Sequence, residues 1–226
     1  MRRVLLAALV LMATMAYSPR ASAAESRTWT SSDTFSETPV WLSVSIEERI
    51  VLGDAQTAMF ASDQAVGFGI GVAASLHLDH HWSLGLLAAF DFPLGPDIAE
   101  AYAVVNADVS RLDTSFALRV QYDPLALWWM TLGVVLDVGL TLDSTTVKAG
   151  GEEADGTEVL GLVEALVQLT FFPHDAFELG LRGGYRYLLG DRVILDSAAA
   201  ARLHVPAGPY RGNGDGIVEV YEAIHF

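Results

Sequence analysis

The sequence predicts an all-β protein, an antiparallel up-and-down transmembrane β-barrel of about eight strands that follows an N-terminal signal peptide. Hydrophobic residues make up 52% of the 226 residues and charged residues only 18%, against about 25% charged residues in a typical soluble domain. After the first twenty residues, no apolar run reaches the ~18 residues that a membrane-spanning helix needs. Apolar residues instead recur at every second position. A closed barrel of such strands can face lipid while pairing all its backbone groups.

The first segment has the pattern of a secretory signal. Arg2 and Arg3 precede an apolar core over residues 4–16, which is too short to span a bilayer, and Pro19 ends that core. Ala21-Ser22-Ala23 then gives the small residues of a cleavage site. A retained anchor helix is the alternative. We predict cleavage after Ala23 or Ala24, with a signal peptide at residues 1–23, a flexible periplasmic lead-in at 24–38 and the barrel at 39–226.

The first three strands show the alternation most clearly. Residues 40–52 set valine, leucine and isoleucine against serine and glutamate. In residues 66–79, large apolar side chains occupy the even positions, and glycine or polar residues occupy most odd positions. A helical repeat of 3.6 residues cannot produce that pattern. The third strand is assigned to residues 82–92, directly after a short turn.

Five further segments continue the pattern. Residues 112–122 oppose phenylalanine, leucine and valine to arginine and glutamine, and residues 127–142 form a long alternating run. Residues 158–172 and 177–188 again place charged or amide side chains on one face only. The last strand is assigned to residues 217–226, although residues 193–205 are also fairly apolar.

The connections between these strands alternate in length. The short connections are residues 79–81, a turn around Asp123-Pro124, and residues 173–175. The long connections are residues 53–65, 93–111, 143–157 and 189–216. Short turns at one end and long loops at the other are typical of bacterial membrane barrels, and an even strand number places both chain ends on the side of the short turns.

Aromatic residues gather near the short-turn ends of the strands, where they would form a girdle at the membrane interface. An ordinary hydrophobic core with scattered aromatic residues is the alternative, but it does not account for their position at one end. The predicted girdle consists of Trp41, Trp82, Tyr122, Trp128, Trp129, Phe171 and Phe177.

The signal segment, the alternating strands and the terminal Phe226 resemble the small outer-membrane barrels of the OmpA, OmpX and OmpW type. The resemblance is one of architecture, and it implies residence in the outer membrane with contact to its lipid and lipopolysaccharide. It also implies that the barrel-assembly machinery recognises the last strand. The signal residues would be Phe226, Ile224, Val220 and Val218. Glu222 departs from this pattern because it would face lipid in the same register.

Charged residues of both signs fall on the inward face of the strands. An eight-stranded barrel is about wide enough for side chains to fill its interior, and buried charges need partners. We therefore predict a lumen charge network in which Arg119, Arg182 and Arg186 face Asp137, Glu164 and Glu178. A filled lumen is the preferred interpretation. A narrow conduit stays open as an alternative because the glycine and alanine face of residues 66–79 leaves room.

Composition excludes several functions. The net charge of -15 disfavours nucleic-acid binding. The absence of cysteine excludes disulfides, thiol nucleophiles, cysteine zinc sites and a lipoprotein anchor. No cofactor, no metal site and no nucleophile–base set is predicted, so we expect a protein that is not an enzyme.

Four functional hypotheses follow. The first is a structural or interaction barrel in the cell envelope with a narrow or filled polar lumen, whose acidic external loops could meet the divalent cations that bridge lipopolysaccharide. The second is a barrel that transports small solutes or hydrophobic compounds. The third is a soluble secreted barrel that binds a ligand inside, which requires apolar faces that point inward. The fourth is a lipid-modifying barrel enzyme. The oligomeric state is left open.

Overall fold

The computed structural model describes residues 40–52, 64–79, 81–93, 107–127, 129–174, 177–190, 195–205, 207 and 214–226. The predicted signal peptide, its cleavage site and the lead-in therefore lie outside the described residues. The elements are β1 (Val40–Leu52), β2 (Gln64–His77), β3 (Trp82–Pro93), β4 (Asp108–Leu127), β5 (Met130–Ala149), β6 (Glu152–His174), β7 (Phe177–Leu189), α3 (Ser197–Leu203) and β8 (Gly214–His225).

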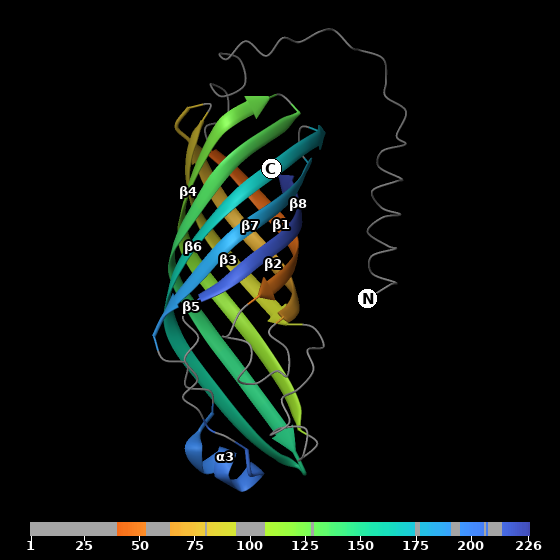
Figure 1. Ribbon diagram of the computed structural model, residues 1–226, viewed down its shortest axis with the longest axis vertical. Coiled ribbons are helices and arrows are strands. Elements are labelled where there is room, and N and C mark those ends of the chain that lie inside the picture. Colours follow the sequence, from red (N-terminus) through yellow and green to blue (C-terminus); the bar gives the residue numbers. More distant parts are fainter. Residues whose placement is uncertain are drawn as a thin grey trace.

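The strands form one closed ring in sequence order (Figure 1). Each strand pairs antiparallel with the next, and β1 pairs with β8 to close the barrel, for example through Ile46 opposite Glu222. Closure leaves no sheet edge around the barrel wall. The predicted fold class, an up-and-down barrel of eight antiparallel strands, is confirmed.

Apolar side chains of the barrel wall point outward and polar ones point inward. Leu86, Leu140 and Val167 on the outer surface have exposed fractions of 65%, 54% and 56%. Glu219 and Asp137 on the inner surface are 0% and 1% exposed. This is the reverse of a soluble barrel with an apolar pocket, and it is the arrangement that suits a lipid surround. In the part of the chain that is described, no helix has the length and apolarity to cross a bilayer.

The short turns close one end of the barrel and differ in detail from the prediction. Between β2 and β3, the Asp79 carboxylate accepts hydrogen bonds from the backbone N–H groups of His81 and Trp82, at 2.7 and 2.8 Å. Pro124 was expected at the turn between β4 and β5. It lies instead within β4, where the register shifts between Tyr122 and Leu125, and the strand continues to Leu127. Proline lacks a ladder donor, so a β-bulge is where a strand tolerates it.

β4, β5 and β6 extend well beyond the predicted strands. Residues 143–157 were expected to be a loop, and they form instead the distal parts of β5 and β6 and their turn, paired from Asp143–Glu158 to Ala149–Glu152. Gly150 and Gly151 connect the strands with φ of 58° and 88°, the backbone conformation that tight two-residue hairpins require and that glycine adopts without strain. The strand pair projects toward α3, at the end of the barrel opposite the C-terminus (Figure 1).

The polarity of the strands inverts in this extension. On β5, the outward side chains change from Leu140 and Leu142 to Ser144 and Thr146, and the inward ones change from Asp143 to Val147, which is 0% exposed. An outward face cannot stay polar against acyl chains. The apolar part of the outer face of β5 therefore ends at Leu142.

Helix α3 covers the apolar inner face of the extension. Ala199, Ala200 and Leu203 pack with Val147 and Ala154 in one buried cluster. Asp196 begins the helix by accepting a hydrogen bond from the Ala199 N–H at 2.8 Å, and His204 ends it in the left-handed conformation with φ of 58°. This helix lies in the apolar stretch at residues 193–205 that competed for assignment as the last strand.

Candidate functional site: the charged lumen

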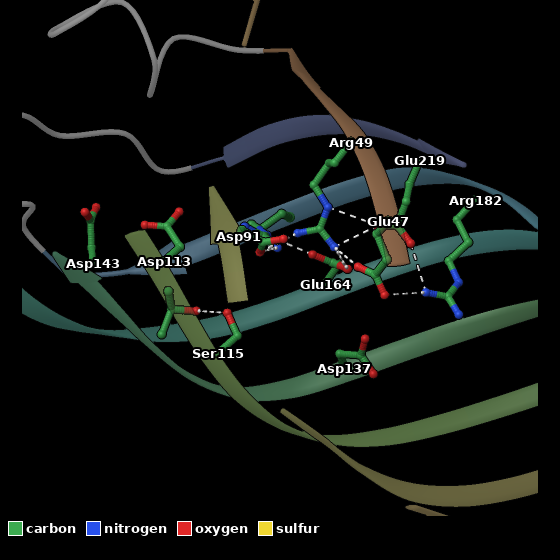
Figure 2. Close-up of polar contacts among 12 residues, drawn as sticks. Glu47, Arg49, Asp91, Asp113, Ser115, Asp137, Asp143, Glu164, Arg182 and Glu219 are labelled. Atoms are coloured by element: carbon green, nitrogen blue, oxygen red, sulfur yellow. Dashed lines mark hydrogen bonds and ion pairs between the residues drawn. The ribbon is translucent and has the colours of Figure 1, made fainter. Parts of the chain in front are cut away.

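Charged side chains from five strands meet in the middle of the lumen (Figure 2). Their positions follow from strand parity, since each has the same parity as the buried inward residues of its strand. We call this set the central charge network. It contains the carboxylates of Glu47, Asp91, Glu164 and Glu219 and the guanidiniums of Arg49, Arg182 and Arg186.

Arg49 on β1 connects the most strands. Its Nη1 donates to Asp91 Oδ2 on β3 at 3.0 Å, and its Nε and Nη2 donate to Glu219 Oε2 on β8 at 3.0 and 2.7 Å. Its Nη2 also lies 4.0 Å from Glu164 Oε1 on β6. One guanidinium thus contacts carboxylates from three other strands of the lumen, which suits the fixed, planar arrangement of its N–H donors.

Arg182 and Arg186 on β7 complete the network. Arg182 donates to Glu219 Oε1 at 2.9 Å and to the Gln168 side chain at 2.7 Å, and its guanidinium carbon lies 3.8 Å from the centre of the Tyr221 ring. Arg186 donates to Glu164 Oε2 at 2.8 Å and lies 3.5 Å from Asp91 Oδ2. Charges, an aromatic ring and an amide therefore converge inside the lumen at this level.

Only some of the ion pairs predicted for the lumen charge network are present in the structure. Arg119 pairs with Asp137, and Arg186 pairs with Glu164. Glu178 interacts electrostatically with Arg182, as expected, but its short contact is with His225 Nε2 at 2.8 Å, near the short-turn end.

Two members of the network were not singled out from the sequence. Asp91 and Glu219 bind Arg49 from β3 and β8. Both have the inward parity of their strands, which was the available signal. Glu47 and Arg49 have the inward parity of β1, but their partners depend on how the barrel closes and cannot be assigned from parity alone.

Nearer the extension, Arg111 forms a second charged group. Its Nη2 lies 2.9 Å from Asp113 Oδ2 and 3.2 Å from Asp143 Oδ2. Ser115 and Thr141 share a hydrogen bond of 2.9 Å nearby. Across the described ranges, no three histidine, aspartate or glutamate side chains are arranged to hold a metal ion.

Most of the described girdle residues face outward at the short-turn end. Trp82 and Tyr122 pack with ring centroids 4.5 Å apart, and Trp129 stacks on Phe171 at 6.1 Å. Phe177 is paired with the outward Ile224, and Trp128 lies outside the described residues. The prediction that Trp41 belongs to the girdle is wrong. Its ring points into the lumen between His77 and His225, at 4.7 and 5.0 Å, because position 41 has the parity of Glu47.

The last strand has the alternation that the resemblance implied. Its outward row, at 42%, 46%, 48% and 75% exposure, is Val218, Val220, Ile224 and Phe226. Glu222 belongs to the same row, opposite Ile46 of β1. Glu48 of β1 also faces outward, opposite Val220, so these two acidic residues are diagonal neighbours on the outer side of the seam between β1 and β8.

Comparisons with known proteins place the fold. No protein-family model matches the chain, and no curated protein matches its sequence. A solved structure of a major outer membrane protein from Thermus thermophilus superposes with a TM-score of 0.57 at 12% identity, covering 84% of this chain and all (100%) of that one. Neisserial surface protein A superposes with a TM-score of 0.52 at 10% identity, covering 84% and 98%. Identities this low show the fold alone. The chain therefore has the fold of the small eight-stranded outer-membrane β-barrels.

Proposed function

We propose that the protein is an integral outer-membrane barrel whose lumen is closed by its own side chains, and that it serves the cell envelope as a structural or surface-interaction element. The observation that carries this proposal is the pair formed by Arg186 on β7 and Asp91 on β3, at 3.5 Å. β3 and β7 are four positions apart in the ring of eight strands. The ion pair therefore joins opposite walls across the lumen.

The outer surface supports the location in a membrane. Large apolar side chains on all eight strands are exposed, including Leu42, Leu86, Phe116 and Val167 at 46%, 65%, 51% and 56%. A soluble monomer rarely exposes a continuous apolar patch of more than a few hundred Å². Trp82 and Trp129 at the short-turn end, 44% and 41% exposed, have the position of an interfacial girdle.

The glycine face of β2 does not provide a conduit in this arrangement. A methyl group at Gly69 would lie 2.7 Å from Asp91 Oδ1 and 3.5 Å from Glu47, and one at Gly71 would overlap the Ser45 hydroxyl. The space that these glycines leave is thus occupied by the central charge network. The transport hypothesis has no specific observation in its favour, and the proposal includes no catalytic activity.

Planar-bilayer recording tests the closed lumen. We expect no steady conductance from the wild-type protein. A charge-balanced variant, Glu47→Ala/Arg49→Ala/Asp91→Ala/Arg186→Ala, removes two carboxylates and two guanidiniums from the central charge network and should conduct. The matched control is Lys148→Ala/Glu153→Ala, which removes an exposed pair outside the lumen and should stay silent. A steady wild-type conductance that Gly69→Leu abolishes would contradict the proposal and favour transport.

Location is tested separately. In fractionated cells we expect the protein in the outer membrane, with the altered gel migration on heating that is usual for folded barrels. Recovery of the folded protein in the soluble periplasmic fraction would refute the membrane assignment.

A further inference from the structure

The extension of β5 and β6 presents an ordered polar surface directly above the lipid-facing wall. Three cross-strand pairs point outward, and each member lies opposite its partner in the register of the two strands. We call this surface the polar grid. It consists of Ser144, Thr146 and Lys148 on β5 and Glu153, Asp155 and Thr157 on β6.

We propose that the polar grid binds the saccharide portion of an outer-leaflet glycolipid. The inference rests on the proposed membrane location, because the same strands run without interruption from the apolar wall into the grid. Leu140 and Val159 lie on the outer face just before the grid and are 54% and 56% exposed. A lipid whose acyl chains cover Leu140 and Val159 places its polar headgroup beside the next outward residues of the two strands.

The height of the grid matches a sugar layer better than a thin phosphate layer. A strand rises about 3.3 Å per residue and is tilted by about 40°, so the step from Ser144 to Lys148 lifts the surface by about 10 Å. The polar interface of a phospholipid leaflet accounts for only about 5–8 Å beyond the hydrocarbon. The upper part of the grid therefore extends past that interface, into the region that glycolipid sugars occupy.

The chemistry of the grid also favours sugar hydroxyls. Thr146 Oγ1 donates to Asp155 Oδ1 at 2.7 Å, and the hydroxyls of Ser144 and Thr157 lie 3.3 Å apart. Both pairs retain unused donor or acceptor capacity on an open face, which suits the adjacent hydroxyls of a pyranose ring.

A bare phosphate is the poorer ligand because of the charges on the same surface. Lys148 pairs with Glu153 at 3.2 Å, and Asp155 adds a second carboxylate. Two carboxylates and one ammonium group give the grid a net negative charge, which repels an anion.

The grid is rigid enough to serve as a binding surface. The opposite face of the extension is packed against α3, where Val147 and Ala154 are 0% and 1% exposed. Strand pairing and this packing hold the outward side chains in place before a ligand arrives. Such preorganisation lowers the entropic cost of binding.

Binding is measured with the full-length protein in a sugar-free amine-oxide detergent. The probes are a glycolipid that carries an uncharged core oligosaccharide and the corresponding lipid without sugars. We expect the core-bearing lipid to bind about tenfold more tightly, equivalent to about 1.4 kcal/mol, with no effect of a chelator. The variant Ser144→Ala/Thr146→Val/Thr157→Val should lose this preference while its folded gel migration is retained.

Two adjacent residues provide a matched control. Glu153 belongs to the grid, whereas Glu152 has the opposite parity and pairs with Arg202 at 3.5 Å. Glu153→Gln should change the affinity for the core-bearing lipid by at least about threefold, and Glu152→Gln should not. Equal binding of both probes, a preference that survives the triple variant, or binding that a chelator removes would each overturn the proposal. Fractionation tests the membrane location independently of this result.

Discussion

Arg119 on β4 and Asp137 on β5 form a two-pronged ion pair inside the barrel wall. Nε–Oδ1 is 2.8 Å and Nη2–Oδ2 is 2.7 Å, and the two residues are direct cross-strand partners. They are 8% and 1% exposed. Removing one member of such a pair leaves a buried charge without its partner, which costs about 3–5 kcal/mol, whereas replacing both with apolar groups is often neutral.

We therefore expect Arg119→Met and Asp137→Leu each to lower the free energy of unfolding by about 3–5 kcal/mol, and the double variant to recover to within about 1 kcal/mol of the wild type. Equilibrium urea unfolding in lipid vesicles, followed by tryptophan fluorescence, measures all four proteins. A double variant that loses the sum of the two single losses would show that the pair is not an independent unit.

Glu222 occupies an outward position that apolar residues otherwise fill on β8. An acidic side chain on the lipid face costs less than the ~2–4 kcal/mol of a basic one at mid-membrane. We expect Glu222→Leu to raise the free energy of unfolding in vesicles by about 1 kcal/mol. Glu48→Leu tests the diagonal neighbour in the same way. Unchanged or lower stability of both variants would place the two carboxylates in contact with water or a partner.

Gly183 and Gly184 are neighbours on β7 with opposite surroundings. A methyl group at Gly184 would overlap the Ala165 carbonyl oxygen of β6, whereas one at Gly183 would have its nearest neighbour, the Ile217 carbonyl oxygen, 3.7 Å away. We expect Gly184→Ala to destabilise the barrel by about 1–3 kcal/mol through overpacking. Gly183→Ala should be neutral or stabilising by up to about 1 kcal/mol. Urea unfolding compares them, and equal losses would mean that backbone entropy alone matters at both sites.

Asp196 caps a helix that packs on the extension. Because Asp196→Ala removes the acceptor of the Ala199 N–H, it should cost α3 about 1 kcal/mol. Hydrogen exchange of amides 197–203 is expected to accelerate about fivefold, with exchange in β1–β3 unchanged. Acceleration throughout the barrel would show that α3 and the barrel unfold as one unit.

Strand parity allowed most of the barrel to be predicted. β1, β2, β3 and β7 lie within about two residues of their expected ends, because an apolar outer face and a polar inner face impose a strict period of two. β4, β5 and β6 were predicted too short, because beyond the apolar part of the wall their outward residues become polar and resemble a loop. β4 also continues past Pro124 to Leu127 at its other end. Gly150-Gly151, between two alternating runs, was the hairpin signal that could have revealed the extension.

The lumen was harder to predict than the wall. Arg119 and Asp137 were both expected inside, and adjacent strands in register bring them together. The ion pairs of Asp91 with Arg49 and with Arg186 depend on which strands face one another after the barrel closes. That relationship follows from strand tilt and stagger around the whole ring. Trp41 shows the reverse case, because its end position suggested a girdle while its parity placed it inside.

The inversion of polarity along β4, β5 and β6 gives the molecule a direction within the plane of a membrane. On β1 and β7 the last outward residues whose side chains are described, Ile50 and Leu189, are still apolar and 41% and 54% exposed. On β5, by contrast, the outward face continues beyond Leu142 as a polar sheet. A neighbouring protein that approaches from the β5 side meets this raised sheet. In a crowded membrane, the barrel should therefore prefer some rotations about its own axis over others.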